Sequence, residues 1–240
     1  SRVPASLPFV EFILANALGR AVELKDMSTA AHTWRVTMYA QAIGEAAGMP
    51  TDELMRFMTG AVVHDLGKLD IPDEILQKPG RLDAAEYRCI QTHAALGFDR
   101  LRRLDVTDPL ILNVVRSHHE RLDGSGYPDN LAGDAIPIEA KRFAIIDGFD
   151  AMTSLRPYRS DVGVEAAQRA ITELKDHCDS WYDRESVELF NDLFEAGRLD
   201  SILHHLNDAT ALEELTGPAD EATLAMAEDA IRRSTPPDRD

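Results

Sequence analysis

The chain has 240 residues, with 42 Asp and Glu against 25 Lys and Arg, and its formal net charge is −17. This size fits one domain, or one domain with an appendage, and it can bury a core without a disulfide scaffold. A surface this acidic repels the phosphate backbone of DNA and RNA, so the charge argues against binding to nucleic-acid polymers. A small anionic substrate remains compatible with the charge, provided that metal cations receive it.

Two further features of the composition bear on the compartment. The chain contains two cysteines, Cys89 and Cys178, and no secretory leader is recognisable, which favours a reducing cytoplasm. The longest apolar stretch, residues 7–18, is too short to cross a bilayer and contains Glu11. We therefore expect a cytoplasmic protein without membrane insertion in this chain.

Apolar residues recur at helical spacing along nearly the whole chain. The first pattern predicts a connector helix within residues 1–25. The clearest pattern covers residues 54–62 and follows a helix start signal at Pro50. A capping-box pattern at Asp83 and Glu86 predicts another helix, with one apolar stripe running from Tyr87 through His93 to Leu101.

Two more helices follow in the sequence. Pro109 stands at a favoured first helical position behind Asp108, and this helix leads into His118. The last of the four begins near Pro137 and runs to Asp150. Between them, residues 120–136 form a long loop rich in glycine, and loops of this length are commonly functional or disordered.

The C-terminal part carries most of the negative charge. Residues 176–240 hold 17 Asp and Glu and 5 Lys and Arg, a net charge of −12, which leaves −5 for residues 1–175. We expect an all-α helical bundle with an additional helical, acidic C-terminal extension exposed to solvent. The predicted division is a connector helix over 1–25, a catalytic domain over 26–198 and an acidic tail over 199–240 whose end is disordered. Within the acidic part, an apolar stripe over residues 185–195 faces the core.

Five of the eight histidines fall on apolar faces or at the ends of predicted helices. A single histidine there is more often a hydrogen-bonded core residue than a ligand. Burying all five together with two aspartates, without partners, would cost several kcal/mol for each group. Metal ions would satisfy all of them at once. The candidate ligands are His32, His64, Asp65, His93, His118, His119 and Asp147.

Imidazole and carboxylate ligands in a helical bundle, with one aspartate able to bridge, are typical of a site that holds two metal ions about 3.5–4 Å apart. Such a site is best suited to phosphoester hydrolysis by a bridging hydroxide, while the metals neutralise the phosphate oxygens. Mixed ligands of this kind favour iron or manganese, and zinc or nickel can also occupy them.

Several longer motifs occur together in a fixed order. They are His64-Asp65 with Gly67-Lys68, residues 71–76, Lys78-Pro79-Gly80, His118-His119-Glu120 with Gly126-Tyr127-Pro128, and Asp147 followed by Arg156 and Arg159. In this order they resemble the HD-GYP subfamily of the HD phosphohydrolase superfamily over about residues 10–195. The resemblance implies an HD-domain helical bundle and a bacterial phosphodiesterase that converts cyclic di-GMP to linear pGpG, in some members onward to GMP.

The resemblance also implies roles for individual residues. The seven candidate ligands would hold two divalent ions, with Asp65 as the bridging, catalytic carboxylate. Lys68 would reach the substrate phosphate and the bridging water, although it also reads as a surface lysine. Asp150, one helical turn after Asp147, is expected to orient a ligand and not to bind metal.

The implied substrate contacts lie later in the chain. Gly126, Tyr127 and Pro128 match the loop that lines the substrate site, where glycine permits close backbone approach. An ordinary turn is the alternative for this loop. Arg156 and Arg159 match positions that hold the substrate phosphates, and either could instead pair with a nearby carboxylate.

The chain departs from the family pattern at Ser28. Members with three metals have a glutamate there, and Ser28 is more simply the N-cap of the helix that carries His32. We therefore expect a two-metal centre and hydrolysis to pGpG, with slow further hydrolysis to GMP as the alternative. Asp26 would be a replacement ligand only if the chain bends. A second departure, over residues 177–183, is expected to change local packing only, and we expect His204-His205 to lie on a solvated helix face.

Other functions and partners remain open at this stage. The substrate could be another cyclic dinucleotide such as cyclic GMP-AMP, or the chain could be a weakly active module that binds cyclic di-GMP and signals through proteins. Diguanylate cyclases or cyclic-di-GMP effectors could dock on the Tyr127 loop. The helix over residues 7–23, which includes Leu18, could pack in a homodimer. Because residue 1 is Ser, we expect a fragment with an N-terminal sensory or receiver domain outside it.

Overall fold

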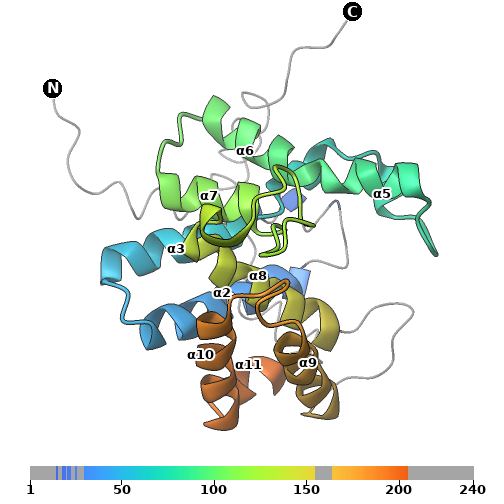
Figure 1. Cartoon of the computed structure of the whole chain (residues 1–240). Coiled ribbons are helices and arrows are strands. Elements are labelled where there is room, and N and C mark those ends of the chain that lie inside the picture. Colours follow the sequence, from blue (N-terminus) through green and yellow to red (C-terminus); the bar gives the residue numbers. More distant parts are fainter. Residues whose placement is uncertain are drawn as a thin grey trace, which may run out of the picture.

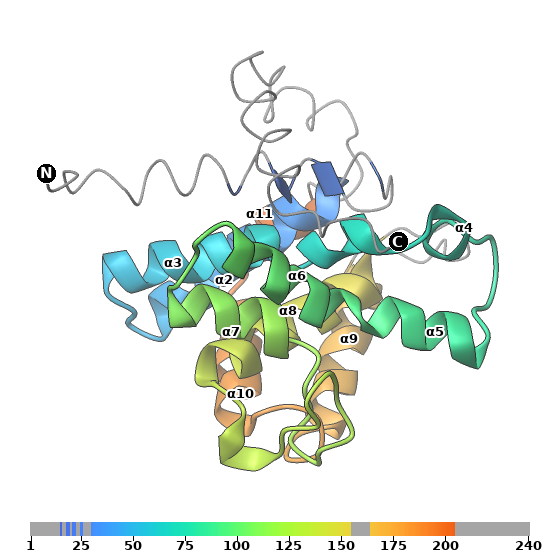
Figure 2. The ribbon, with the colours of Figure 1, turned by 90° about the horizontal axis from the view of Figure 1, so that it is seen from above.

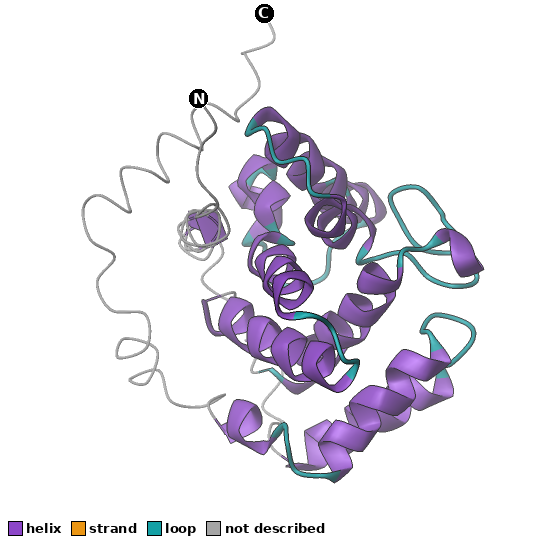
Figure 3. Ribbon diagram, turned by 90° about the vertical axis from the view of Figure 1, so that its left-hand side faces the viewer, coloured by secondary structure: helices purple, strands orange, loops and turns teal. Residues whose placement is uncertain are grey.

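The computed structural model of the chain describes residues Ala15, Leu18, Gly19, Ala21, Val22, Lys25, 30–154 and 164–204. In this part of the chain every regular element is a helix (Figure 3), and the β pairing consists of isolated bridges. The predicted all-α fold is confirmed. The elements are α2 (Ala30–Ala46), α3 (Thr51–Val63), η1 (Leu66–Asp70), α4 (Asp73–Leu76), α5 (Ala84–Gln91), α6 (His93–Arg103), α7 (Pro109–Ser117), η2 (Gly133–Ala135), α8 (Ile138–Thr153), α9 (Val164–Asp176), α10 (Arg184–Glu195) and α11 (Asp200–His204).

The predicted helix starts are confirmed. The Asp83 carboxylate accepts from the backbone N–H of Glu86 at 2.9 Å, and the Asp83 N–H donates to the Glu86 carboxylate at 2.7 Å, so the capping box is complete. Asp108 caps α7 by accepting from the N–H of Leu110 at 3.0 Å. These caps satisfy backbone donors that a helix start otherwise leaves without partners.

The predicted stripe from Tyr87 to Leu101 is wrong as one helix, because the chain breaks at Thr92 between α5 and α6. The Thr92 hydroxyl donates to the Cys89 carbonyl at 2.6 Å, and the Nδ1 of His93 donates to the Ile90 carbonyl at 2.7 Å. Figure 2 shows α4 and α5 extending away from the bundle. Tyr87 is consequently 50% exposed, whereas Leu101 lies in the core.

The larger core lies between α2, α8, α9 and α10, and Figure 1 shows α9, α10 and α11 together below α2 and α8. Its centre is aromatic. Phe190 has no exposed surface and meets Tyr39 and Phe149 in edge-to-face contacts, with ring centroids 5.9 and 5.0 Å apart. Such contacts add stabilisation beyond the buried area itself.

Phe190→Ala is expected to lower the free energy of unfolding by about 3–5 kcal/mol, because it removes a fully buried ring and leaves a cavity. Urea denaturation measures the change. Tyr87→Ala removes an aromatic ring that is 50% exposed, and we expect it to stay within about 0.5 kcal/mol of the parent chain. Equal losses in the two variants would contradict this account of the core.

A second apolar cluster lies under the N-terminal residues. Leu18 and Val22 are buried against Val62, Val63 and neighbouring residues of α3 and α7. Leu18 is 2% exposed within a single chain, so this residue does not offer the dimer surface suggested for its helix.

The acidic C-terminal part begins inside the core. Val187, Phe190 and Leu193 of α10 are buried, as the apolar stripe predicts. Leu199 and Leu203 join the same cluster, so this beginning of the expected solvated tail packs with the helical domain. Residues 205–240, including His205 and the end expected to be disordered, lie outside the described residues, as does the side chain of His204. None of the helices in the described ranges is both long and apolar enough to span a membrane.

Candidate metal centre

The seven candidate ligands come from five helices and converge on one region of the bundle. Four of the five histidines stand at helix ends, where a side chain can turn inward without disturbing the helical hydrogen bonds. His32 lies in α2, His64 and Asp65 follow α3, His93 begins α6, His118 and His119 follow α7, and Asp147 lies in α8. His32, His64, Asp65, His93 and His118 are buried.

One group of ligands joins α2, α3 and α8. His32 Nε2 lies 3.2 Å from His64 Nε2 and 3.6 Å from Asp147 Oδ1. One donor atom from each of these three residues lies within 4.8 Å of the other two, which is close enough for a shared metal ion.

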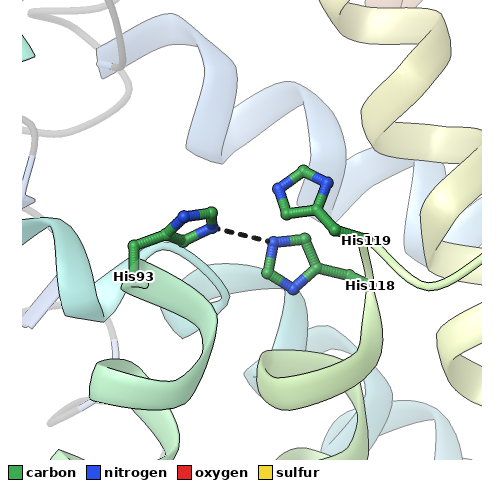
Figure 4. A group of neighbouring side chains, drawn as sticks. All are labelled: His93, His118 and His119. Atoms are coloured by element: carbon green, nitrogen blue, oxygen red, sulfur yellow. Dashed lines mark hydrogen bonds between the residues drawn. The ribbon is translucent and has the colours of Figure 1, made fainter. Parts of the chain in front are cut away.

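A second group consists of His93, His118 and His119, whose rings converge from α6 and the end of α7 (Figure 4). The Nε2 atoms of His93 and His118 lie 3.3 Å apart. The ring of His119 lies 5.0 Å from that of His93 between centroids, and it is the most exposed of the three.

Asp65 lies between the two groups. Its Oδ2 is 3.2 Å from His64 Nε2, and its Oδ1 is 3.4 Å from His93 Nε2. Asp147 also lies between the two groups, because its Oδ1 faces His32 of the first group and its Oδ2 lies 4.0 Å from His119 Nδ1 of the second. The two oxygens of Asp65 are thus placed to serve two ions.

Outer hydrogen bonds fix which ring nitrogen faces the site. The Nδ1 atoms of His64 and His93 each donate to a backbone carbonyl at 2.7 Å, and that of His118 lies 3.0 Å from two carbonyls. The Nδ1 of His32 donates to Asp150 at 2.8 Å. Each Nε2 therefore points inward and, in the neutral ring, carries the lone pair that a metal ion binds, which is the arrangement of metal-binding histidines.

The spacing of these Nε2 atoms fits divalent cations. Two lone pairs facing each other at 3.2 and 3.3 Å repel unless a proton or a cation lies between them. Two ligand atoms that are each about 2.1 Å from one ion lie roughly 3.0–3.4 Å apart. The donor set of imidazoles and carboxylates therefore fits a cation at each group.

Electrostatics prepare these residues as ligands. Burial holds the pKa of His93 below its usual value, and burial together with neighbouring imidazoles holds the pKa of His118 and His119 well below it. Burial alone would raise the pKa of Asp65, but Lys68 and His64 outweigh it and keep that pKa well below its usual range. Three imidazoles are thus neutral and the carboxylate is ionised near neutral pH, as metal binding requires.

His64 differs from the other histidines. Burial disfavours its charged form, but the charge and hydrogen bond of Asp65 outweigh burial and raise the pKa of His64. A cation placed between these two residues would replace the proton that Asp65 favours.

The other predicted site residues divide into two sets. Lys68 lies in the site, with its Nζ 2.8 Å from Asp65 Oδ2, so it is not a plain surface lysine. Arg156 and Arg159 lie outside the described residues, and so do Ser28 and Asp26.

The Tyr127 loop closes over the second histidine group. The ring of Tyr127 lies 4.7 Å from that of His119 between centroids, and its N–H donates to the His119 carbonyl at 3.1 Å. A Cβ on Gly126 would lie 2.5 Å from the Cα of Glu120, so glycine is required by the approach of the chain's own backbone. The Glu120 carboxylate accepts from the N–H of Asp129 at 2.7 Å and fixes the far side of the loop.

A buried arginine beside the site was not predicted from the sequence. Arg35 is 3% exposed and pairs with Asp150 through two hydrogen bonds of 2.5 and 2.9 Å. Asp150 also accepts from His32, as expected for a residue that orients a ligand. Burial would raise the pKa of Asp150, but the hydrogen bonds of His32 and Arg35 outweigh it and keep that pKa far below its usual range. The signal in the sequence is the spacing of three residues between His32 and Arg35, which places both on one face of α2.

Asp150→Asn is expected to weaken metal binding about 10- to 100-fold, because His32 loses the carboxylate that orients it. The change also leaves the buried Arg35 without a counter-charge, so we expect a loss of about 3–5 kcal/mol in stability. Metal titration and denaturant unfolding measure the two effects. Ser154→Ala is the comparison variant, because it removes a hydroxyl that contacts both Arg35 at 2.7 Å and Asp150 at 2.8 Å but keeps the carboxylate and its charge. Unchanged metal affinity in Asp150→Asn would refute the orienting role.

Comparison with known proteins places this geometry in a family. The family model described as "HD domain" matches residues 15–186. The chain belongs to the HD domain family. Its fold, with the His64-Asp65 pair after α3 inside a helical bundle, is the fold of that family, and the resemblance predicted from the motifs is confirmed.

Several curated relatives are named phosphodiesterases. The chain is 39% identical over 157 residues to the cyclic di-GMP phosphodiesterase response regulator RpfG of Xanthomonas campestris, a match that covers 63% of this chain and 40% of that protein. It is 38% identical over 182 residues to a cyclic di-GMP phosphodiesterase of Thermotoga maritima, covering 75% and 48%. It is 39% identical over 150 residues to the 3'3'-cGAMP-specific phosphodiesterase 2 of Vibrio cholerae, covering 61% and 28%. The matches span less than half the length of each of these three relatives.

Solved structures support the fold. The cyclic GMP-AMP-specific phosphodiesterase V-cGAP3 of V. cholerae aligns with a TM-score of 0.62 at 19% identity, covering 95% of this chain and 59% of that chain. Bd1817 of Bdellovibrio bacteriovorus, described as an HDG"Y"P protein, aligns with a TM-score of 0.55 at 20% identity, covering 71% and 53%. At these identities the structures show a shared fold.

Proposed function

We propose that the chain is the catalytic part of a metal-dependent phosphodiesterase that hydrolyses cyclic di-GMP to linear pGpG. The observation that carries this proposal is the position of Asp65, whose two oxygens face two adjoining histidine groups. The Nζ of Lys68 lies 2.8 Å from Asp65 Oδ2. A cationic side chain and two potential metal positions therefore surround the Asp65 carboxylate. The names of the relatives supply the substrate class.

Two bound divalent ions would supply Lewis acidity and a nucleophile derived from water at neutral pH. The chain's own residues position this chemistry. His32, His64 and Asp147 would hold one ion, His93, His118 and His119 the other, and Asp65 would contact both. Lys68 donates to Asp65 and would donate in turn to an oxygen of the scissile phosphate, which stabilises the charge that develops there. Burial of the first five ligands keeps bulk water from competing with these contacts.

The Tyr127 loop would receive the nucleotide. The Tyr127 ring lies beside His119 at the more open side of the site, where an aromatic face can stack on a base. Burial, reinforced by the nearby Asp147 and Asp65, raises the pKa of Tyr127 well above its usual value, so its hydroxyl remains a hydrogen-bond donor. The motifs assign Gly126 and Pro128 to this wall, and they assign Arg156 and Arg159 to the substrate phosphates.

We further propose iron or manganese as the two ions, since the mixed ligands favour them, with zinc or nickel as substitutes. The serine at position 28 supports two ions and not three, and hence pGpG as the end product. A cytoplasmic location and control by an N-terminal sensory or receiver domain complete the proposal, since one relative is named a response regulator.

Purified chain loaded with Mn²⁺ tests the proposal through metal-dependent release of linear product from cyclic di-GMP. We expect activity that EDTA abolishes and that returns with added Mn²⁺. Binding of cyclic di-GMP without turnover in metal-loaded chain would instead favour a signalling module that acts through protein partners.

Cyclic GMP-AMP is the second candidate substrate, because a relative at 39% identity is named specific for it. Mixing the two cyclic dinucleotides at equal concentrations separates the candidates. Faster consumption of cyclic di-GMP supports the leading proposal, and faster consumption of cyclic GMP-AMP replaces it.

A further inference from the structure

Arg121 occupies an unusual position at the start of the Tyr127 loop. Its guanidinium carbon lies 3.8 Å from the ring centroid of Trp181. The ring of His177 stacks on the same indole at 3.7 Å, with an angle of 4° between the planes. With both groups this close to the indole, the imidazole and the guanidinium must lie on opposite faces of Trp181. A stack of this kind fixes the plane of the guanidinium.

The stack is attached to both sides of the site. The N–H of Leu122 donates to the Trp181 carbonyl at 3.3 Å, and the N–H of Asp123 donates to the Ser180 carbonyl at 2.8 Å, which joins the loop to the turn before α10. The next residue, Tyr182, packs on α8, where a Cβ on Gly148 would lie 2.8 Å from its hydroxyl. Gly148 directly follows the candidate ligand Asp147. Arg121 is thus held in place relative to α8 as well as to the loop.

Arg121 differs from other arginines near the site in its partners. Arg35, Arg100 and Arg116 each form two hydrogen bonds with one aspartate. Within the ranges 30–154 and 164–204, no ion pair of this kind is present at Arg121, and its guanidinium instead lies against the indole face of Trp181. Stacking occupies the face of a guanidinium, and the N–H donors on its edge stay available to groups other than the indole.

The charge of Arg121 reaches the aromatic residues of the site. Burial, together with Asp147, raises the pKa of Tyr182 to about 12, and Arg121 opposes this rise. Arg121 also opposes the rise in the pKa of Tyr127, which has burial as its main cause. Both tyrosines are therefore within electrostatic range of Arg121 and of Asp147, which agrees with a position of Arg121 at the rim of the site.

We propose that Arg121 is a further substrate-binding residue of the phosphodiesterase. Its edge donates a pair of hydrogen bonds to a pair of acceptors on the cyclic dinucleotide. Two parts of that molecule present such a pair: the O6 and N7 atoms of a guanine base, and the oxygens of the phosphodiester that is not cleaved. This inference rests on the proposed function, and it gives the departure over residues 177–183 a role, because His177 and Trp181 hold the arginine.

The test compares Arg121→Gln, Arg121→Lys and a charge-matched control, Arg198→Gln, in Mn²⁺-loaded chain. The side chain of Arg198 is 53% exposed and pairs with Glu45 of α2, and neither residue is a candidate site residue. We expect Arg121→Gln to raise the KM for cyclic di-GMP about 10-fold or more while kcat changes less than about 3-fold, because a bidentate contact is lost. Arg121→Lys keeps the charge but not the planar pair of donors, so its KM should stay close to that of Arg121→Gln. Arg198→Gln should keep the parent KM.

A second readout does not depend on turnover. The indole of Trp181 contacts Arg121, so its fluorescence reports on that arginine. In a Trp34→Phe background, rapid mixing with cyclic di-GMP should change the Trp181 fluorescence. The same mixing should leave it unchanged when Arg121→Gln is added. If Arg121→Gln lowers kcat at constant KM, Arg121 only supports the loop and the proposal is overturned. A KM within about 2-fold of the parent also overturns it.

Competition with cyclic di-AMP, which has no guanine, distinguishes the two acceptor pairs. If Arg121→Gln weakens the binding of cyclic di-GMP and leaves the binding of cyclic di-AMP unchanged, the contact is to guanine. Equal weakening assigns it to the phosphodiester. A parent chain that neither binds nor cleaves any cyclic dinucleotide contradicts the proposed function, and Arg121 with it, whereas an active chain insensitive to Arg121→Gln contradicts this inference alone.

Discussion

Asp65→Asn is expected to reduce hydrolysis of cyclic di-GMP by about 10³-fold and to lower the bound metal from two ions per chain to one or none. The reason is that Asp65 faces both histidine groups, with Oδ2 3.2 Å from His64 and Oδ1 3.4 Å from His93. Asparagine keeps the shape but loses the charge and one acceptor oxygen. It also removes the carboxylate that pairs with Lys68 at 2.8 Å. Elemental analysis after gel filtration and initial rates measure the two effects.

Asp176→Asn is the matched control for this prediction. Asp176 is exposed at the end of α9, so the substitution removes the same charge away from the site. We expect the parent metal content and rate in this control. An Asp65→Asn variant with two ions and the parent rate would remove Asp65 from the mechanism.

Gly67→Ala is expected to cost more than about 3 kcal/mol of stability, because α6 and η1 meet at this residue with no room for a methyl group. A Cβ on Gly67 would overlap the carbonyl oxygen of His93 and would lie 2.5 Å from the backbone nitrogen of Gly97. Backbone atoms cannot rotate away as a side chain can. The substitution should therefore push η1, which carries Lys68, away from α6, which begins with His93.

Gly44→Ala makes the same change in α2, where the added Cβ would meet the far end of the Leu54 side chain at 2.5 Å and the Met49 sulfur at 3.1 Å. These flexible groups can move, and alanine favours a helix over glycine by about 1 kcal/mol. We expect a small net effect here. Urea denaturation of both variants gives the comparison, and equal stability of the two would contradict the close approach of η1 and α6.

Much of the fold follows from local patterns in the sequence. The caps at Asp83 and Asp108 satisfy backbone donors within a few residues, so their effect is encoded locally. The break at Thr92 was missed because a stripe of apolar residues continues across it in projection. At this break, the Nδ1 of His93 donates a hydrogen bond to the Ile90 carbonyl while the ring turns toward the site. The apolar pattern does not encode this contact.

The ligands were predictable for a different reason. Five histidines and two aspartates at apolar positions require partners, and that requirement can be read without any structure. The residues that hold these ligands could not be predicted in this way, because their partners are distant in sequence. Arg35 meets Asp150 across 115 residues, and Arg121 meets Trp181 across 60 residues. Charged and aromatic residues of this kind also occur on solvated surfaces, so the sequence alone does not distinguish them.

The product profile of the metal-loaded chain tests the central claim most directly. The chain is loaded anaerobically with iron(II), and separately with manganese(II), its metal content is measured, and cyclic di-GMP products are followed by chromatography. The account predicts about two ions per chain and accumulation of pGpG. Two bound ions without any linear product would contradict it.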